Sequence, residues 1–190
     1  MLIVSFDIGI INLGACIVKD DKIVSWKVIR LMEKCSKNTS ISVLADVIYS
    51  QMDLFLNDIE PTDKIDYVLL ENQPSRINGG MKTVQMILFG YFQNLKHYDT
   101  RVSSIVQVNP KLKLAWVENI DKTGLSKQEQ YKQNKEVSVS ICSKFIQNDE
   151  RLCTLFRENG KKQDDLADSF LQIIGFAKNK KLSLKILEYI

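Results

Sequence analysis

The chain has 190 residues, of which 45% are hydrophobic and 26% charged, a composition typical of a globular protein. Its 26 Lys and Arg residues against 23 Asp and Glu residues leave a net charge of +3, which permits nucleic-acid binding without demonstrating it. No apolar run approaches the ~20 residues that cross a bilayer, and the N-terminus lacks a signal-peptide pattern, so we expect a soluble protein that is not secreted and has no membrane partner.

Cysteine and histidine are too few and too scattered for several kinds of site. The four cysteines form no C-x-x-C pair, and His97 is the only histidine. Zinc fingers and histidine-rich metal sites are therefore excluded, and a Cys–His or Ser–His catalytic pair would have to use His97, which follows Lys96 near an expected helix end. We interpret the cysteines as small buried hydrophobic residues in a reducing compartment. They are Cys16, Cys35, Cys142 and Cys153.

Hydrophobic periodicity predicts alternating strands and helices along the chain. The expected strands cover residues 2–6, 13–19, 22–31, 65–71 and 102–108. The expected helices cover residues 39–57, 82–96, 133–146 and 164–177, with one more short turn of helix over 182–189. Thr39 or Ser40 is placed to cap the first helix. A polar, lysine-rich stretch follows the fifth strand, which ends at Asn109-Pro110.

The order of these elements indicates the fold class. Three meander strands pair antiparallel, whereas each later strand–helix–strand unit implies a parallel, right-handed crossover, so the sheet should be mixed. We expect a single α/β domain over residues 1–190, with a five-stranded mixed sheet flanked by helices in three layers.

Four carboxylates occupy positions where this scaffold would gather them. Asp7 ends the first strand, Glu71 ends the fourth, and Asp165 and Asp168 lie three residues apart on one face of the last long helix. Asp164 is also available to that face. Two unit charges about 4 Å apart repel by roughly 4 kcal/mol at an effective dielectric of 20, so such a cluster requires a cation.

Oxygen ligands without histidine or thiolate favour Mg²⁺ or Mn²⁺ over zinc. Two such ions about 3.5–4 Å apart can activate a water and stabilise the leaving oxygen in phosphodiester hydrolysis. Each acid alone has an ordinary explanation, because Asp-x-Gly is often only a turn and Asp-Asp often only begins a helix. Glu71 does not fit that explanation, since it ends a largely apolar strand, and together the acids favour a nuclease site.

Three segments carry a family resemblance: residues 3–14, with Asp7 and Gly9; residues 69–73, Leu-Leu-Glu-Asn-Gln; and residues 162–170, with Asp-Asp-Leu-Ala-Asp-Ser at 164–169. In this order they resemble the Holliday junction resolvases of the ribonuclease H-like superfamily, most closely those of poxviruses and related large DNA viruses, which resemble bacterial RuvC. The likeness extends over nearly the whole chain.

The resemblance implies a homodimer that binds four-way DNA junctions and nicks two opposed strands symmetrically, in viral DNA recombination and concatemer processing. It implies two Mg²⁺ ions, replaceable by Mn²⁺, bound by Asp7, Glu71, Asp165 and Asp168, and no nucleotide cofactor. With no run of five or more basic residues to serve as a nuclear import signal, we expect the host cytoplasm, with the nucleus as the alternative.

The family also has a catalytic lysine between the last strand and the acid-bearing helix. Two residues match, Lys113 after Asn109-Pro110 and Lys135, and we prefer Lys135 because we expect it to open a helix docked beside the sheet. The helix over 82–96 resembles the family's dimer helix, although its apolar stripe could equally be monomer core. The candidates for DNA phosphate contacts are Arg76, Lys82, Lys111, Lys113 and Lys132.

Three other functions use a related scaffold. The segment Asp-Ile-Gly-Ile-Ile-Asn-Leu-Gly also resembles the first phosphate loop of actin-like ATPases, but those proteins need a second such domain and this chain is too short. A ribonuclease H acting on RNA–DNA hybrids would use a similar arrangement of acids. A non-catalytic nucleic-acid-binding scaffold would use them only as caps, without metal affinity or cleavage.

Overall fold

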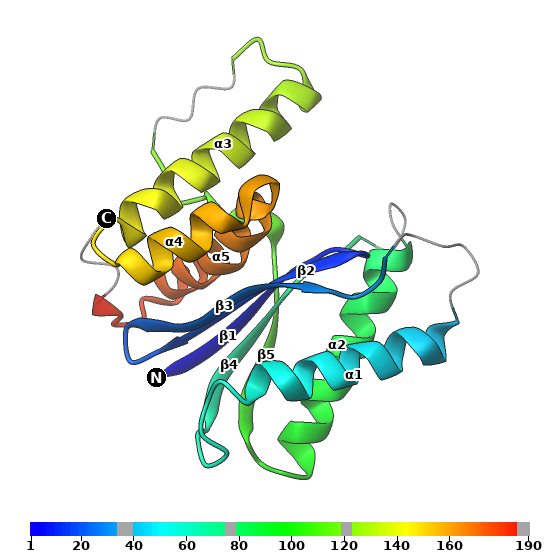
Figure 1. Ribbon diagram of the computed structural model, residues 1–190. Coiled ribbons are helices and arrows are strands. Elements are labelled where there is room, and N and C mark those ends of the chain that lie inside the picture. The colour runs from blue at the N-terminus through cyan, green and yellow to red at the C-terminus, as the bar shows by residue number, and fades with distance from the viewer. Residues whose placement is uncertain (34–39, 75–78, 119–122, 186–190) are drawn as a thin grey trace.

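A five-stranded mixed sheet forms the centre of the molecule in the computed structural model, which describes residues 1–33, 40–74, 79–118 and 123–185 (Figure 1). The strand order is β3-β2-β1-β4-β5. β1 pairs antiparallel with β2 and parallel with β4, β2 pairs antiparallel with β3, and β4 pairs parallel with β5. The strands are β1 (Leu2–Ile8), β2 (Asn12–Lys19), β3 (Lys22–Arg30), β4 (Ile65–Glu71) and β5 (Val102–Val108).

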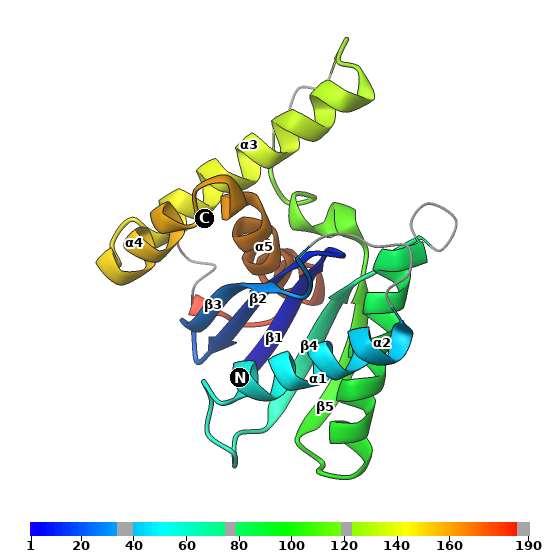
Figure 2. The same cartoon turned by 45° about the vertical axis from the view of Figure 1, so that its right-hand side comes forward.

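Helices cover both faces of this sheet, which gives the three layers that the sequence predicts (Figures 1 and 2). One face carries α1 (Ile41–Leu56) and α2 (Gly79–His97). The other carries α3 (Lys127–Ile146), α4 (Glu150–Glu158) and α5 (Gln163–Lys180), together with the short 3₁₀ helices η1 (Pro110–Lys113) and η2 (Gly160–Lys162). The expected fold class is confirmed.

Alternation along the strands divides the core into two clusters. Val4 and Phe6 of β1 point toward α1 and α2, whereas Ile3 lies in the cluster around α5. Because side chains alternate along a strand, Ser5 and Asp7 share the face of Ile3. The apolar stripe of α2 belongs to the monomer core: its buried members are Val84, Leu88, Tyr91 and Phe92.

Several boundaries differ from the sequence prediction. α3 begins at Lys127 rather than at residue 133, because Ser126 and Glu129 form a reciprocal capping box. α4 was not predicted, nor was η1 within the lysine-rich stretch. Ser40 does precede α1, but its side chain contacts Ser42 instead of capping the helix. Thr39, and residues 186–189 of the expected turn over 182–189, lie outside the described residues.

Buried groups tie α5 to the sheet. The Trp26 indole is 2% exposed, stacks on Phe156 and donates a 2.9 Å hydrogen bond to the Leu166 carbonyl. Cys16 and Cys142 are buried free thiols, as expected, whereas Cys153 is half-buried and Cys35 lies outside the described residues. Within the described ranges, no helix is both long and apolar enough to cross a membrane.

Candidate active site

Two of the predicted acids come from adjacent parallel strands. In the register between β1 and β4, Phe6 lies opposite Leu70, so the next residues, Asp7 and Glu71, lie side by side at the carboxyl ends of their strands. Leu69 belongs to the cluster around α5, and alternation therefore also turns Glu71 toward that helix. The sheet alone thus brings two carboxylates to one edge on one face.

A glycine on β2 allows the first turn of α5 to reach them. Gly14 pairs with Asp7 across the antiparallel ladder. A Cβ at Gly14 would lie 2.2 Å from the Asp165 carbonyl oxygen and 3.3 Å from the Asp7 Cβ, so the helix backbone rests directly on the strand at this point. Asp165 and Asp168, three residues apart, are thereby held next to Asp7.

A second close approach positions a lysine. Asn109 caps η1, and its side chain accepts a 3.0 Å hydrogen bond from the Lys111 amide. A Cβ at Gly175 of α5 would lie 2.1 Å from the Leu112 carbonyl oxygen, so η1 packs tightly on α5. This contact directs the next residue, Lys113, toward the acids.

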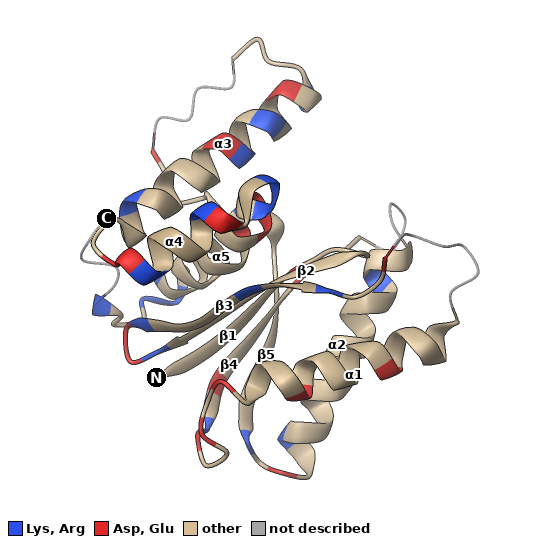
Figure 3. Ribbon diagram, viewed as in Figure 1, with Lys and Arg blue, Asp and Glu red and all other residues tan. Residues whose placement is uncertain are grey.

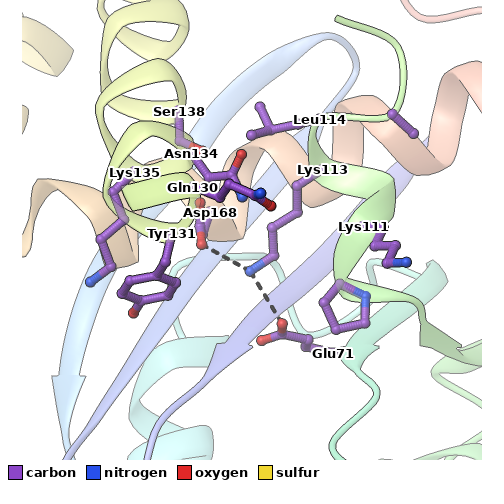
Figure 4. A pocket seen from close by; sticks show the side chains of 12 residues that line it. Glu71, Lys111, Lys113, Leu114, Gln130, Tyr131, Asn134, Lys135, Ser138 and Asp168 are labelled. Carbon is purple, nitrogen blue, oxygen red and sulfur yellow. Dashed lines mark hydrogen bonds and ion pairs between the residues drawn. The ribbon is translucent and has the colours of Figure 1, made fainter. Parts of the chain in front are cut away.

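The Lys113 ammonium lies among three carboxylates, of which Figure 4 shows Glu71 and Asp168. Its Nζ is 2.6 Å from Asp7 Oδ1, 3.0 Å from Asp168 Oδ2 and 3.5 Å from Glu71 Oε1. The Lys113 side chain is only 7% exposed. Carboxylates from β1, β4 and α5 therefore converge on one buried cation.

Lys135 contacts a different acid, Asp164, and the expectation that it opens a helix was wrong. It does not open a helix: α3 begins at Lys127, so Lys135 lies in its third turn. Its ammonium pairs with Asp164 and lies 4.9 Å from the centroid of the Tyr131 ring. Lys113, conversely, belongs not to a loop but to η1, which packs on α5.

The remaining acids are arranged around this centre. Asp164 is directed to α3 through Lys135, and Asp165 pairs with Lys162 at 3.3 Å. Asp165 is nevertheless close enough to Asp7 for the two charges to repel each other. The structure thus joins Asp7, Glu71 and Asp168 through Lys113 and places Asp165 beside them.

The cluster carries more negative charge than its lysines compensate. Burial, opposed by Lys113 and assisted by Glu71, raises the pKa of Asp7 to about 6. Burial is also the main cause that raises the pKa values of Asp165 and Asp168. Burial disfavours the Lys113 ammonium, but the three carboxylates outweigh it and raise the lysine's pKa far above its ordinary value. Lys113 therefore stays protonated at neutral pH.

The donor chemistry of the site suits a divalent cation. Among the described residues, no group of three or more His, Cys, Asp or Glu side chains is arranged to hold a metal ion, because Lys113 lies between the carboxylates. The available ligands are nevertheless all carboxylate oxygens, and three carboxylates share the single positive charge of Lys113. These properties fit Mg²⁺ or Mn²⁺.

The candidate DNA-contacting residues are dispersed. Lys111 is exposed beside the site, and Lys132 is 81% exposed on α3, with Glu136 at 3.8 Å. Lys82 is held by a 2.9 Å hydrogen bond to Gln85, while Lys113 is occupied by the carboxylates. Lys and Arg residues recur along α3 and in the turn before α5 (Figure 3). Arg76 lies outside the described residues.

Sequence reasoning missed several supporting residues. Glycine destabilises the interior of a strand or a helix. Gly14 inside a strand and Gly175 inside a helix were therefore signals that another backbone segment approaches closely at these positions. Ser138 of α3 is 2% exposed and hydrogen-bonds Asp168. Gln172 is fully buried, and its amide donates to Ser5 Oγ at 3.0 Å. A glutamine four residues after Asp168 on an apolar helix face was visible in the sequence.

Solved structures share this fold. The Holliday junction resolvase of fowlpox virus is 18% identical, with a TM-score of 0.60 over 95% of this chain and 99% of that one. The yeast mitochondrial Holliday junction resolvase Ydc2 is 16% identical, with a TM-score of 0.59 over 99% of this chain and 86% of that one. RuvC of Thermus thermophilus, solved in complex with a Holliday junction substrate, is 14% identical, with a TM-score of 0.51 over 95% and 96%.

These likenesses define the class: the protein has a RuvC-like fold. A sequence search of curated proteins found no match. The family model of the poxvirus A22 protein matches residues 1–180, and the chain therefore belongs to the poxvirus A22 protein family. The resemblance inferred from its three acidic segments is confirmed.

Proposed function

We propose that this protein is a metal-dependent endonuclease that resolves four-way DNA junctions by paired, symmetric nicks. The observation that carries the proposal is the convergence of Asp7, Glu71 and Asp168 on Lys113, with Asp165 beside them. This acidic centre lies on a fold shared with Holliday junction resolvases of a poxvirus, a yeast mitochondrion and a bacterium.

The four acids would bind Mg²⁺ or Mn²⁺, two ions to a site. Bound there, such ions supply an activated water and stabilise the leaving 3′ oxygen. Lys113 holds its proton at Nζ and supplies positive charge beside the carboxylates, where a phosphodiester must approach them. We therefore assign the catalytic lysine to Lys113 instead of Lys135. Lys111 and Lys132, both exposed on this side, would contact DNA phosphates.

Two opposed nicks require two active sites, so we propose a homodimer. Met86, 48% exposed, lies on the outer face of α2, the helix that resembles the dimer helix of the family. A charge at this position should weaken an apolar contact between two copies. We expect light scattering to show a dimer for wild type and a smaller mass for Met86→Glu, with nicks that are no longer paired. A monomeric wild type would overturn this part of the proposal.

The biological setting follows from the same activity. We propose that residues 1–190 act as one domain in viral DNA recombination and concatemer processing, in the host cytoplasm. The free thiols of Cys16 and Cys142 are compatible with that reducing compartment. Imaging of the tagged protein during infection would check the location.

A cleavage assay with two matched substitutions tests the proposed activity. Asp168→Asn removes one charge from the site and keeps its shape, whereas Asp46→Asn makes the same change on the exposed surface of α1, across the sheet. Labelled four-way junction, linear duplex and RNA–DNA hybrid are each incubated with Mg²⁺, Mn²⁺ or EDTA. We expect metal-dependent paired nicks in the junction alone, lost in Asp168→Asn and retained in Asp46→Asn.

The same assay separates the competing functions. Cleavage of the hybrid alone would identify a ribonuclease H. Tight junction binding without cleavage in any metal would identify a non-catalytic scaffold. Unchanged metal affinity in Asp168→Asn would remove that residue from the metal site.

A further inference from the structure

A pocket opens directly beside the acidic centre, and the catalytic proposal leaves most of its wall without a role. It encloses about 680 Å³, within the range of small-molecule binding sites. Glu71, Lys113 and Asp168 form one side. The opposite side is formed by α3, from which Gln130, Tyr131, Asn134 and Ser138 line the space, and residues of and after η1 close it (Figure 4).

The α3 wall combines an aromatic ring with amide groups. Gln130 and Asn134 are four residues apart and share one helix face, from which they project toward η1 (Figure 4). Tyr131 is 62% exposed at the pocket, with the Lys135 ammonium near its ring. An exposed aromatic ring next to side-chain amides is the combination with which proteins hold an unstacked nucleobase, by stacking and by hydrogen bonds to its edge.

One atom of this wall has an unmet hydrogen-bonding requirement. Asn134 Oδ1 is buried and accepts no hydrogen bond within the described part of the chain. An acceptor in that condition costs free energy until a donor reaches it, and the Watson–Crick edge of every DNA base offers at least one N–H donor when the base is unpaired. The neighbouring amide side chain on α3, that of Gln133, has an interaction of its own.

The pocket is also in the right place for a base. Glu71, Lys113 and Asp168 belong both to the acidic centre and to the pocket wall, so a nucleotide that flanks a phosphodiester at these acids would lie next to the pocket. Pro110, Leu114 and Ala115 provide an apolar surface there, on which a flat ring loses little on leaving water.

We propose that this pocket binds the unpaired base of a nucleotide next to the cleaved bond, with Tyr131 as the stacking surface and Asn134 as the group that reads the base edge. The inference rests on the proposed function, because it assigns the pocket to the DNA strand that the acids would cut. It makes α3 the element that selects where a junction is cleaved.

The test measures DNA binding and cleavage separately. Junctions with a single abasic nucleotide at each position near the crossover are titrated in EDTA, by fluorescence anisotropy, with wild type and with Asn134→Ala, Tyr131→Ala and Gln128→Ala. Gln128 lies on the exposed side of α3 and is the matched control. We expect one abasic position to weaken wild-type binding about tenfold, and this difference to disappear in the two pocket variants but not in the control.

Cleavage in Mg²⁺ of junctions that vary only in that base provides the second measurement. Wild type should cleave them at unequal rates, and Asn134→Ala should level the rates. Because Tyr131 is largely exposed, Tyr131→Ala remains informative even if Asn134→Ala does not fold. Cleavage by wild type with no effect of any abasic position would overturn the base pocket and leave the nuclease standing. Failure of wild type to cut any junction would instead overturn the nuclease.

Discussion

The two faces of the central sheet differ in the kinds of side chains that pack against them. On the side of α1 and α2 the core is mainly apolar: the Phe6 ring packs on Phe55 and Phe92, with centroids 5.8 and 5.5 Å apart. The buried amide of Gln85 on α2 accepts hydrogen bonds from the Gln73 amide and Lys82, and takes no part in the acidic cluster. On the side of α5 the core includes the fully buried amide of Gln172 and ends in the acidic cluster around Lys113. One face therefore contributes mainly to stability, whereas the other holds like charges close together and so forms a reactive centre.

The two sides also differ in how closely their backbones approach. α5 touches β2 at Gly14 and η1 at Gly175, where no side chain fits. A Cβ at Gly90 of α2 would meet nothing nearer than the Tyr49 hydroxyl at 3.9 Å. Among the glycines within the described helices and strands, Gly14 and Gly175 make these close backbone contacts, and both position functional residues.

Removing the buried cation should have the largest effect. Lys113→Met leaves three carboxylates without their partner and should cost about 3–5 kcal/mol of unfolding free energy at pH 7. Part of the loss should be recovered at pH 5, because carboxylates with raised pKa values are then protonated. Urea unfolding at both pH values, with Lys111→Met as the exposed control, measures this.

The same variant separates charge balance from catalysis. Without the ammonium the site is more negative, so Mn²⁺ should bind more tightly to Lys113→Met, while junction cleavage falls by about 100-fold or more. Titration calorimetry and the cleavage assay give the two readouts. Unchanged cleavage would show that Lys113 serves only as a structural counter-charge.

A cavity on the other side should cost stability alone. Leu88 is fully buried between α2 and the sheet, and Leu88→Ala should destabilise the protein by about 2–5 kcal/mol. At a temperature where the variant is folded, it should cleave junctions at the wild-type rate. Impaired cleavage by folded Leu88→Ala would mean that the α1 and α2 layer shapes the site.

Matched glycine substitutions test the difference in backbone approach. Gly14→Ala forces a Cβ against the Asp165 carbonyl and should cost about 1–3 kcal/mol, with a loss of divalent-ion affinity. Gly90→Ala, in an open helical position, should be neutral or stabilise by up to about 1 kcal/mol. Thermal unfolding of the two variants measures both changes in stability. Equal changes would mean that the backbone approaches no more closely at Gly14 than at Gly90.

The smallest expected effect is a pH dependence of the metal-free protein. The pKa of Asp7 is about 6 in the folded chain, against 3.8 ordinarily. Between these values the folded state holds more protons than the unfolded state, so the free energy of unfolding should fall as pH rises. Unfolding in EDTA should show a smaller decline for Asp7→Asn. Equal slopes of unfolding free energy against pH in wild type and Asp7→Asn would mean that groups other than Asp7 cause the pH dependence.

Local patterns in the sequence were sufficient for the architecture. The strands alternate or are wholly apolar. Asp7 and Glu71 lie at the carboxyl ends of β1 and β4, and Asp168 lies in the second turn of α5, so topology brings them together without fine packing. The start of α3 was also encoded, in Ser126 and Glu129, and α4 in Asp149 followed by Leu152, Leu155 and Phe156. The start of α3 was missed because it lies in a lysine-rich stretch, which suggests a loop.

The position of Lys113 could not be predicted by such means. It depends on a contact between Leu112 and Gly175, which are distant in sequence and touch only after α5 has packed on the sheet. The orientation of Asp164 likewise depends on Lys135 of α3. Long-range packing, rather than residue type or spacing, decided which lysine faces the acids.

The hydrogen bond from the Trp26 indole to the Leu166 carbonyl makes Trp26 fluorescence a reporter of the first turn of α5, which carries Asp164 and Asp165. The chain has two tryptophans, and only Trp26 joins the sheet to the residue that follows Asp165. Any movement of that turn alters the hydrogen bond and the stacking on Phe156, both of which influence indole emission. With Trp116 replaced by Phe, the fluorescence of the unlabelled protein would follow the loading of its own active site in real time.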